Sequence, residues 1–548
     1  MKAAELFVQC LEEEKVEYIF AVPGEENLHV LEALRKSSIK VIVNRHEQAA
    51  AFMAATYGRL TGKAGVVMST LGPGATNLVT GVAHAQLGGM PLVVITGQKG
   101  IRENWQGNFQ VVNVVEMMRP ITKYTTQILG PKSIPKEVRN AFKLATSERQ
   151  GVCHLELPED VADEEVKGFT PQPVIALRRP IADSKSIRIA ADEIKKAKKT
   201  VLIVSSRAQR TRVKEALEQF CDATNLYVVH TQLGKGVLRA DHHNCLHSFG
   251  IHKKDYVNCL LEKADLIITV GYSTAEYPPY VWNAEGKKKI LHIDFTPARN
   301  DTFYAPIGEV IGDIATSLDS LREALQSFRN EGSFEEQLKK ELEKKLFKNQ
   351  NDDDSYPLKP RRIVADCRKA LGKEDILCLD NGIYKLWFSR HYPAYGIGTF
   401  LLDNTLATMG AGLPSAMTAK LFNPYKKVLA VVGDGGFMMN SQELETAVRL
   451  KLNVVILILN DNAYGFIKWK QQQMNYADFS LDYGNPDFVK YAESYCAHGF
   501  KVKKASDLLK ILEKAFQLQG PVVIECPIDY SENKKTWGEE LSNVVCPS

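Results

Sequence analysis

The feature that most constrains the fold is a series of short, β-branched apolar runs separated by helical segments. Between the runs, apolar residues recur with the period of amphipathic or alanine-rich helices. This alternation is typical of parallel sheets that helices cover on both faces. We therefore predict an α/β protein built from doubly wound parallel sheets. The runs are GVVMST, PLVVITG, VLIVSS, DLIITVG, KILHIDF, KVLAVVG and NVVILILN.

Two polar stretches divide this alternation into three parts. Residues 163–184 are rich in proline and charge, which predicts a linker. Residues 330–362 predict a solvated helix followed by a disordered joint. The chain has 548 residues, enough for three domains of ordinary size. The predicted domains are 1–165, 185–330 and 355–530, with a C-terminal tail at 531–548.

Composition excludes several function classes. The formal net charge is only +4 and the chain has no dense basic run, so we expect neither nucleic acid nor an anionic membrane as a partner. No apolar run approaches the roughly 18 residues of a membrane-spanning helix. The first residues carry charge and have no apolar segment, so we expect no signal peptide and a cytoplasmic location. The ten cysteines include no CxxC pair, which predicts reduced, mostly buried thiols.

Two βαβ units have the same spacing. Val66 opens a run that ends in STLGPG, and the next run opens at Leu92. Val428 opens a run that ends in GDGG, and the next run opens at Val454. Both intervals are 26 residues. The match suggests an internal duplication, although any βαβ unit has a similar length.

The segment VVGDGGFMMNSQELETAVRLKLNVVILILNDNAYG (431–465) carries the clearest chemistry. Asp434 follows one predicted strand and Asp461 follows the next, so their carboxylates can converge at the carboxyl edge of a parallel sheet. Two carboxylates, a main-chain carbonyl and phosphate oxygens make an octahedral Mg²⁺ site. Gly435 and Gly436 let the backbone approach a diphosphate, and the following helix start can donate N–H groups. A lone GDG would indicate only an ordinary turn, but its spacing to Asp461 is much more specific.

These residues resemble those of the thiamine diphosphate (ThDP)-dependent enzymes. GDG followed about 27 residues later by a polar loop ending in YG is similar to the family's cofactor motif. The likeness covers nearly the whole chain and is nearest the acetolactate synthase and pyruvate oxidase group. It implies a pyrimidine-binding domain, a Rossmann-like central domain and a diphosphate-binding domain. The other matching segments are RHEQAAAFMAATYGRLTGKAGV (45–66), LGPGATNLVTGVAHA, PLVVITGQ, FQ (109–110), RPITKY (119–124) and TMGAGLPSAM (408–417).

The resemblance also implies the roles of individual residues. Glu47 would hydrogen-bond N1′ of the aminopyrimidine and favour the tautomer that removes the thiazolium C2 proton. Met409 would lie under the cofactor and hold its bent conformation, and Gln110 would lie near the substrate. Asp434, Asp461 and the carbonyl of Ala463 would hold Mg²⁺. The candidate cofactor-binding residues are Pro23, Pro73, Asn77, Asn381, Gly382, Tyr384, Met409, Gly435, Gly436 and Tyr464.

The same resemblance implies an oligomer. Glu47 would belong to one subunit and the metal site to another, so we expect a homodimer or tetramer with the active site between subunits. The resemblance is also compatible with a regulatory small subunit.

The central domain indicates a flavin-free enzyme. The run VLIVSSRAQR (201–210) lacks the glycine that flavin-binding members usually carry. The segments GYSTAEYPPYVWN (271–283) and LHIDFTP (291–297) resemble the catabolic type of acetolactate synthase. Asp461 stands where flavin-dependent members usually have Asn. The implied cofactors are therefore ThDP and Mg²⁺, without FAD.

The implied reaction joins two pyruvates to 2-acetolactate with loss of CO₂, through a hydroxyethyl intermediate on ThDP. Related decarboxylases often use a histidine pair in the first domain. The adjacent pair in this chain, His242 and His243, lies in the predicted central domain, where we expect it to be exposed. The lack of a pair in the first domain favours carboligation over simple decarboxylation.

Three departures keep other functions open. Glu159 stands where biosynthetic acetolactate synthases typically have Lys, and Lys470 stands at the position of a pocket tryptophan, with Trp469 one position early. The loop 95–110 also differs from both usual subtypes. These features are compatible with another ThDP-dependent 2-oxoacid decarboxylase or carboligase with a different donor or acceptor. A catalytically silent binding or regulatory paralogue is a third hypothesis, against which the intact Glu47 and acidic metal motif argue. Biosynthetic and catabolic pathways both remain open.

Overall fold

The computed structural model describes residues 1–102, 109–176, 178–251, 254–348, 353–541, 543, 544 and 546. Two compact units divide the chain. The first comprises Met1–Arg178, Thr405–Pro424 and Gly436–Leu452. The second comprises Arg179–Asn404, Tyr425–Gly435 and Asn453–Ser548. The domain boundaries expected from the sequence remain predictions.

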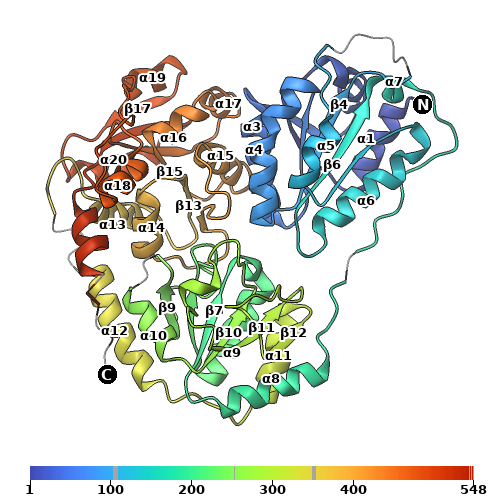
Figure 1. The fold of residues 1–548 in the computed structure, drawn as a ribbon. Coiled ribbons are helices and arrows are strands. Elements are labelled where there is room, and N and C mark those ends of the chain that lie inside the picture. The colour runs from blue at the N-terminus through green and yellow to red at the C-terminus, as the bar shows by residue number, and fades with distance from the viewer. Residues whose placement is uncertain are drawn as a thin grey trace. The chain divides into compact units, whose positions relative to one another are not determined.

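The described residues form three six-stranded parallel sheets with helices between the strands, so the predicted α/β class is confirmed (Figure 1). The first sheet has the order β2 (Lys40–Val43), β1 (Tyr18–Ala21), β3 (Gly65–Ser69), β4 (Leu92–Gln98), β6 (Val152–Pro158), β5 (Tyr124–Gln127). The second has the order β12 (Gly308–Ile311), β11 (Lys289–Asp294), β10 (Leu266–Val270), β7 (Thr200–Val204), β8 (Tyr227–His230), β9 (Cys245–Ser248). The third has the order β14 (Phe400–Leu401), β13 (Ile376–Leu379), β15 (Val428–Gly433), β16 (Val455–Asn460), β18 (Val522–Pro527), β17 (His498–Lys501).

The α-helices lie between or after these strands. They are α1 (Ala3–Glu13), α2 (Leu28–Arg35), α3 (Glu47–Thr61), α4 (Gly72–Gly88), α5 (Val114–Met118), α6 (Ile134–Thr146), α7 (Glu159–Asp163), α8 (Ser184–Lys196), α9 (Thr211–Thr224), α10 (Tyr256–Lys263), α11 (Ile314–Ala324), α12 (Ser333–Phe347), α13 (Pro360–Ala370), α14 (Tyr384–His391), α15 (Gly412–Phe422), α16 (Asp434–Met439), α17 (Glu443–Arg449), α18 (Gly465–Gln473), α19 (Phe488–Ser494) and α20 (Asp507–Ala515).

The first and third sheets have the same topology. Counted from the first strand of each sheet, both have the order 2-1-3-4-6-5. Gly65 pairs with Leu92 in the first sheet, and Leu429 pairs with Val455 in the third, so the first interval is one residue longer. The shared strand order supports the duplication suggested by the two βαβ units. In both of these sheets the direction of the strand order reverses between the first and third strands, which are β1 and β3 in one sheet and β13 and β15 in the other. Open α/β sheets bind ligands at the carboxyl ends of the strands at such a point.

The central sheet is buried on both faces. Alternate residues of β7 point to opposite sides: Leu202 and Val204 pack with α8, α9 and α11, whereas Val201 and Ile203 pack with α10 and α12. The expectation of a solvated helix in residues 330–362 is wrong for one side of that helix. Helix α12 buries Leu338, Leu342 and Leu346 against this second face. The spacing of these leucines places them on one side of the helix, which the many charged residues of the segment obscured.

Helix α3 is apolar all round because neighbours surround it within the first unit. Residues Ala49 to Gly58 are all buried. The helix packs against α4, α15, β1 and β3, and Thr418 of α15 donates from Oγ1 to the Met53 carbonyl at 3.2 Å. A helix with no solvent-facing side is apolar all round. Its first residue, Glu47, therefore lies at the edge of a buried, apolar region.

The expectation that all cysteines are reduced is wrong for one pair. Cys259 of α10 and Cys546 of the tail form a disulfide across a sequence separation of 287. The tail also buries Trp537 against Trp387, at a ring-centroid distance of 5.1 Å. Sequence spacing could not indicate the disulfide because its partners meet only in the folded chain. No helix among the described residues is both long and apolar enough to cross a lipid bilayer.

Candidate functional site

Glu47 lies at the point predicted from the sequence, between a strand and a buried helix. Strand β2 ends at Val43 and α3 begins at Glu47. His46 is the N-cap of the helix, and its Nδ1 accepts a hydrogen bond from the Gln48 N–H at 3.0 Å. This contact gives His46 a capping role and leaves its neighbour Glu47 free to face the strand ends.

The first turn of α4 contacts the Glu47 carboxylate. Asn77 Nδ2 donates to Glu47 Oε2 at 3.0 Å. A Cβ atom added to Gly74 would lie 3.3 Å from Oε1, so the glycine leaves room for this carboxylate. The side chain of Glu47 is only 9% exposed. Two predicted site segments, RHEQ and LGPGATN, thus come together.

Three other predicted residues of the first unit surround the same strand ends and are exposed: Pro23, Pro73 and Gln110. Pro23 follows β1, and Pro73 lies in the first turn of α4 after β3. The Gln110 carbonyl approaches that turn, since a Cβ atom on Gly72 would lie 2.4 Å from it. The structure therefore places Asn77, Pro73 and Gln110 at the first turn of α4, and Pro23 just after β1, the strand that pairs with β3.

The sequence did not indicate an ion pair at this edge of the first sheet. Glu26 is 3% exposed and pairs with Lys99 at 2.8 Å, and Thr70 also donates to its carboxylate. Although burial favours the neutral acid, the hydrogen bonds from Lys99 and Thr70 hold the pKa of Glu26 below its ordinary value. Glu26 follows β1, Thr70 follows β3 and Lys99 follows β4. Only the parallel strand order shows that the three residues are neighbours.

Asp434 and Asp461 occupy the ends of adjacent strands in the second unit, as predicted. Strand β15 ends at Gly433, and β16 ends at Asn460. Asp434 is buried and its carboxylate accepts hydrogen bonds from the Gly435 and Asn462 N–H groups, both at 2.9 Å. Burial raises its pKa against the effect of these bonds. The two N–H groups therefore hold the two oxygens of Asp434, with Oδ1 bound at the start of α16 and Oδ2 bound by the loop after β16.

Residues after β16 complete the acidic site. Burial, followed by the charge of Asp434, raises the pKa of Asp461 to about 7. A Cβ atom on Gly465 would lie 2.3 Å from Asp461 Oδ2, so only glycine accommodates this carboxylate position. The Tyr483 hydroxyl lies within hydrogen-bond distance of both the Asp434 carboxylate, at 3.1 Å, and the Ala463 carbonyl, at 3.2 Å, so its one proton bridges these two acceptors. Two neighbouring carboxylates beside a main-chain carbonyl fit a hard divalent cation.

The sequence did not reveal two polar partners of this site, Tyr483 and Asn485. Asn485 Nδ2 donates to Asp434 Oδ2 at 2.7 Å and to Asn462 Oδ1 at 3.1 Å. Both residues follow α18 in a stretch without regular structure. Their polarity alone is no signal, because such residues are common in surface loops.

The remaining second-unit candidates lie near the same strand ends. Asn381 and Gly382 follow β13, and Tyr384 begins α14. Tyr384 is buried, and its hydroxyl accepts a hydrogen bond from Gly433 N–H at 2.9 Å, next to Asp434. Lys385 donates to Asn381 Oδ1 at 2.7 Å, a contact the sequence did not indicate. Tyr464 is 41% exposed and packs with Tyr483 at a ring-centroid distance of 5.0 Å.

Two candidates from the third predicted domain belong to the first compact unit. Met409 is half-buried, and Gly436 is buried. The Gly410 carbonyl, directly after Met409, accepts a hydrogen bond from Asn440 Nδ2 at 2.8 Å. Asn440 also donates to Gln48 Oε1 at 3.1 Å. One side chain thus connects the turn after Met409 to the helix start at Glu47.

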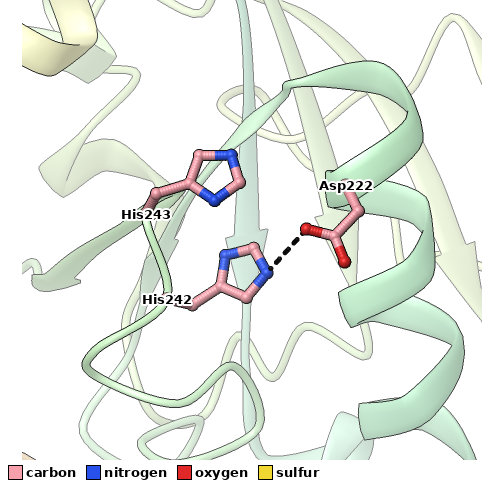
Figure 2. A group of neighbouring side chains, drawn as sticks. All are labelled: Asp222, His242 and His243. Atoms are coloured by element: carbon pink, nitrogen blue, oxygen red, sulfur yellow. Dashed lines mark ion pairs between the residues drawn. The ribbon is translucent and has the colours of Figure 1, made fainter.

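The His242–His243 pair differs from expectation (Figure 2). His243 is exposed, but His242 is only 5% exposed, so the prediction of two exposed rings is wrong for His242. The rings stack with centroids 4.8 Å apart, and His242 Nε2 lies 3.2 Å from Asp222 Oδ1. Asp222 lies on α9 and pairs with His242, the buried member of the pair.

This His/His/Asp group is compact enough to hold a metal, since one ligand atom from each residue lies within 4.8 Å of the others. However, His242 Nδ1 accepts a hydrogen bond from Asn244 N–H at 3.2 Å. Nε2 then carries the proton and donates it to Asp222. Burial lowers the pKa of His242, which favours this neutral ring. A metal-bound histidine instead donates from its second nitrogen, so the hydrogen bonds favour a structural pair.

Comparisons with known proteins agree with this arrangement. Three family models match the chain: the N-terminal TPP binding domain, the central domain and the C-terminal TPP binding domain of thiamine pyrophosphate enzymes, over residues 1–117, 187–321 and 380–526. The chain is 34% identical to acetolactate synthase of Bacillus subtilis strain 168, over 98% of this chain and 95% of the relative. It is also 34% identical to the catabolic acetolactate synthase of Raoultella terrigena, over 99% and 98%. A probable acetolactate synthase large subunit of Methanococcus aeolicus is 32% identical, over 100% and 95%.

Proposed function

The chain belongs to the thiamine pyrophosphate enzyme family, and from this membership we propose that it is an acetolactate synthase that condenses two pyruvates with loss of CO₂. The observation that carries the proposal is the pair of strand-end sites. A buried glutamate at the edge of the first sheet supports activation of the pyrimidine ring. Two acidic residues, Asp434 and Asp461, support metal and diphosphate binding at the third sheet.

We propose that the bound metal is Mg²⁺ because of the chemistry of the candidate ligands. Asp434, Asp461 and the Ala463 carbonyl offer oxygen ligands only, and diphosphate oxygens would complete an octahedron. Burial, followed by the charge of Asp434, raises the pKa of Asp461, and a bound divalent cation would favour the ionised form of both carboxylates. The Gly435 and Gly436 backbone, with Asn381, Gly382, Tyr384 and Tyr464, would contact the diphosphate and thiazolium.

When bound, ThDP supplies the electron sink that makes decarboxylation of a 2-oxoacid feasible. The protein residues control protons and geometry. Glu47 would hold a proton at one carboxylate oxygen and share it with the ring nitrogen N1′, while Asn77 fixes the other oxygen. Pro23, Pro73 and Gln110 would line the approach of the pyrimidine and substrate. Met409 would support the cofactor's bend through its flexible thioether.

We propose that the enzyme works without FAD. In an open parallel sheet, a dinucleotide binds at the carboxyl ends of the strands. In the central sheet this edge holds buried side chains of the chain itself. Ser205, directly after β7, donates to Glu276 Oε2 at 3.1 Å, and Glu276 Oε1 accepts from Leu233 N–H at 2.7 Å. Gln232 adds a hydrogen bond to Tyr277 at 2.8 Å.

The proposed functional unit is at least a homodimer, with a tetramer as the larger form. Apolar side chains are exposed on and after α18, next to the acidic site, and a second copy of the chain would cover them. A regulatory small subunit stays a prediction, prompted by relatives named as large subunits. The exposed residues are Ile467 (50%), Met474 (60%), Tyr476 (62%) and Phe479 (77%).

One observation favours a second candidate, a ThDP-dependent 2-oxoacid decarboxylase or carboligase with another donor or acceptor. Trp469 packs against the core of the third sheet, and Lys470 lies over its ring with Nζ 4.8 Å from the centroid. The acceptor pocket would then present Lys470 in place of a tryptophan. Glu159 also remains unusual, and accepts a hydrogen bond from Gly100 N–H at 3.3 Å.

A turnover assay separates these functions. The purified protein receives pyruvate, ThDP and Mg²⁺, followed by a panel of other 2-oxoacids as donor and acceptor. Acetolactate, detected as acetoin after acid treatment, is the expected product. Acetaldehyde from pyruvate would indicate a decarboxylase, and preference for another 2-oxoacid would indicate a different carboligase. Binding of ThDP without turnover of any 2-oxoacid would indicate a silent paralogue.

A further inference from the structure

A second buried glutamate holds the segment that carries Glu47. Glu443, the first residue of α17, has no exposed surface. Its Oε1 accepts hydrogen bonds from the backbone N–H groups of Arg45, at 2.9 Å, and His46, at 3.1 Å. These N–H groups lie between the end of β2 and the start of α3, where neither the sheet nor the helix supplies an acceptor.

The other oxygen of this carboxylate is also occupied. Glu443 Oε2 accepts from Asn44 Nδ2 at 3.1 Å and from Thr446 Oγ1 at 2.7 Å. Burial raises the pKa of Glu443, while its four donors favour the ionised form. An acceptor with two oxygens in fixed positions is therefore needed to satisfy all four groups.

The bonds reach every residue between β2 and Glu47. Asn44, Arg45 and His46 form that connection, and each donates at least one hydrogen bond to Glu443. On the other side of Glu47, Gln48 accepts from Asn440, which lies three residues before Glu443. The segment 440–443 thus fixes both neighbours of Glu47 although it is almost 400 residues away in sequence.

We propose that Glu443 is a positioning residue for Glu47. It sets where α3 begins and hence where the Glu47 carboxylate stands relative to Asn77 and the strand ends. The inference rests on the proposed function, since it gives Glu47 its role at the pyrimidine ring. A change of about 1 Å in that position is enough to impair a reaction that depends on a short hydrogen bond.

Glu443→Gln is the main test. The amide oxygen can still accept from the two backbone N–H groups, but the NH₂ group then faces the Asn44 NH₂, so either the Asn44 amide turns over or the connection shifts. Glu443→Asp keeps the charge and draws the carboxylate back by one methylene, and it remains informative if the Gln variant does not fold. Glu445→Gln is the matched control, because Glu445 lies on the same short helix and pairs with Arg449 at 3.0 Å.

The main readout is hydrogen–deuterium exchange at C2 of bound ThDP, measured by NMR after acid quenching. ThDP and Mg²⁺ affinity and thermal unfolding are measured on the same samples. We expect exchange about 10- to 100-fold slower in the Gln variant, the range seen for residues that orient a reacting group. The Asp variant should be intermediate and the Glu445 control unchanged. ThDP affinity should change far less than the exchange rate.

A double variant shows whether Glu443 acts through Glu47. With Glu47→Gln already present, Glu443→Gln should slow exchange no further. Additive losses would overturn the inference, as would wild-type exchange in folded Gln and Asp variants or an exchange loss matched by lost ThDP affinity. If Glu47→Gln itself exchanges at the wild-type rate, the role proposed for Glu47 fails instead. The two failures are therefore distinguishable.

Discussion

Asn77 donates a hydrogen bond from Nδ2 to Oε2 of Glu47 over 3.0 Å, joining the first turn of α4 to the first residue of α3. The contact orients a carboxylate that two helices and the turn before α3 otherwise enclose. Because Asn77 binds one oxygen, the other remains available beside Gly74. Glu47 can therefore bind a ligand through Oε1 while Asn77 holds its orientation through Oε2.

Glu47→Gln should fold normally but exchange the ThDP C2 proton about 10²- to 10⁴-fold more slowly, the usual contribution of general acid–base catalysis. Gln keeps the size of the side chain and the contact with Asn77, but it does not share a proton in the same way. NMR of acid-quenched samples in D₂O measures the rate. Unchanged thermal unfolding and Mg²⁺ binding would be the control, and exchange at the wild-type rate would exclude the role of Glu47.

Asp434→Ala should abolish Mg²⁺-dependent ThDP binding, whereas Asp461→Asn should weaken it much less. The alanine removes a buried ligand and leaves Asn485 Nδ2 without its 2.7 Å acceptor, while asparagine keeps an oxygen ligand. We expect a loss of at least about 100-fold for the alanine variant, beyond the ~10- to 100-fold typical of outer-sphere residues. Quenching of intrinsic fluorescence during Mg²⁺ titration measures it. Equal losses in both variants would contradict the assignment.

Gly465→Ala should weaken Mg²⁺ binding by about 10-fold with little effect on folding. The new methyl would lie 2.3 Å from Asp461 Oδ2, so the carboxylate must move away from the site. Isothermal titration with Mg²⁺ and ThDP gives the affinity. Gly484→Ala is the control, because a Cβ atom there meets nothing within 4 Å. Unchanged affinity in the Gly465 variant would mean that Asp461 is not a ligand in this position.

The free energy of unfolding should decrease as the pH is lowered below about 6.5, because His154 is buried in its neutral form. Burial lowers the pKa of this histidine from 6.5 to about 3, so between these values the unfolded chain binds a proton that the folded chain does not. Protonation then favours unfolding by about 1.4 kcal/mol per pH unit, or roughly 2 kcal/mol between pH 6.5 and pH 5.

Urea unfolding of the full chain at several pH values measures this slope. His154→Gln should flatten it, although the lost contacts with Thr96 and Thr125 will lower stability at every pH. His498→Gln, at an exposed position, should leave the slope unchanged. If the His154 variant retains the full slope, another group is responsible.

Reduction of Cys259–Cys546 should destabilise the chain. The bond closes a loop with a sequence separation of 287, for which chain entropy gives an upper limit of about 6 kcal/mol. Protein prepared without reductant should therefore melt at a higher temperature than the same protein with dithiothreitol. Cys546→Ser should remove the difference, and Cys496→Ser, at an exposed free thiol, should not. Ten titratable thiols in the unreduced, denatured protein would contradict the disulfide.

Much of the fold could be predicted because the signals are local. Short β-branched runs alternate with helical segments, so three parallel sheets follow from period and length alone. Asp434 and Asp461 could be placed at neighbouring strand ends for the same reason, since each follows its own apolar run directly. The resemblance then pointed to Glu47 at the equivalent edge of the first sheet, where the structure also places Asn77.

Other features depend on contacts that no local pattern encodes. The charged sequence of α12 predicted solvent exposure, but three leucines on one face find a partner surface on the central sheet. Tyr483 and Asn485 reach Asp434 from a stretch without regular structure. Adjacent histidines give no sign that His242 will be buried and His243 exposed.

The sequence by itself determined the α/β class and the strand-end positions of the acidic residues, because hydrophobic periodicity and glycine turns act over a few neighbouring residues. Tertiary structure alone decided that Glu443 accepts four hydrogen bonds around the turn before Glu47, and that Cys259 meets Cys546. These partners are hundreds of residues apart. Their meeting depends on how whole helices pack, and a buried carboxylate is stable only where packing supplies all of its donors.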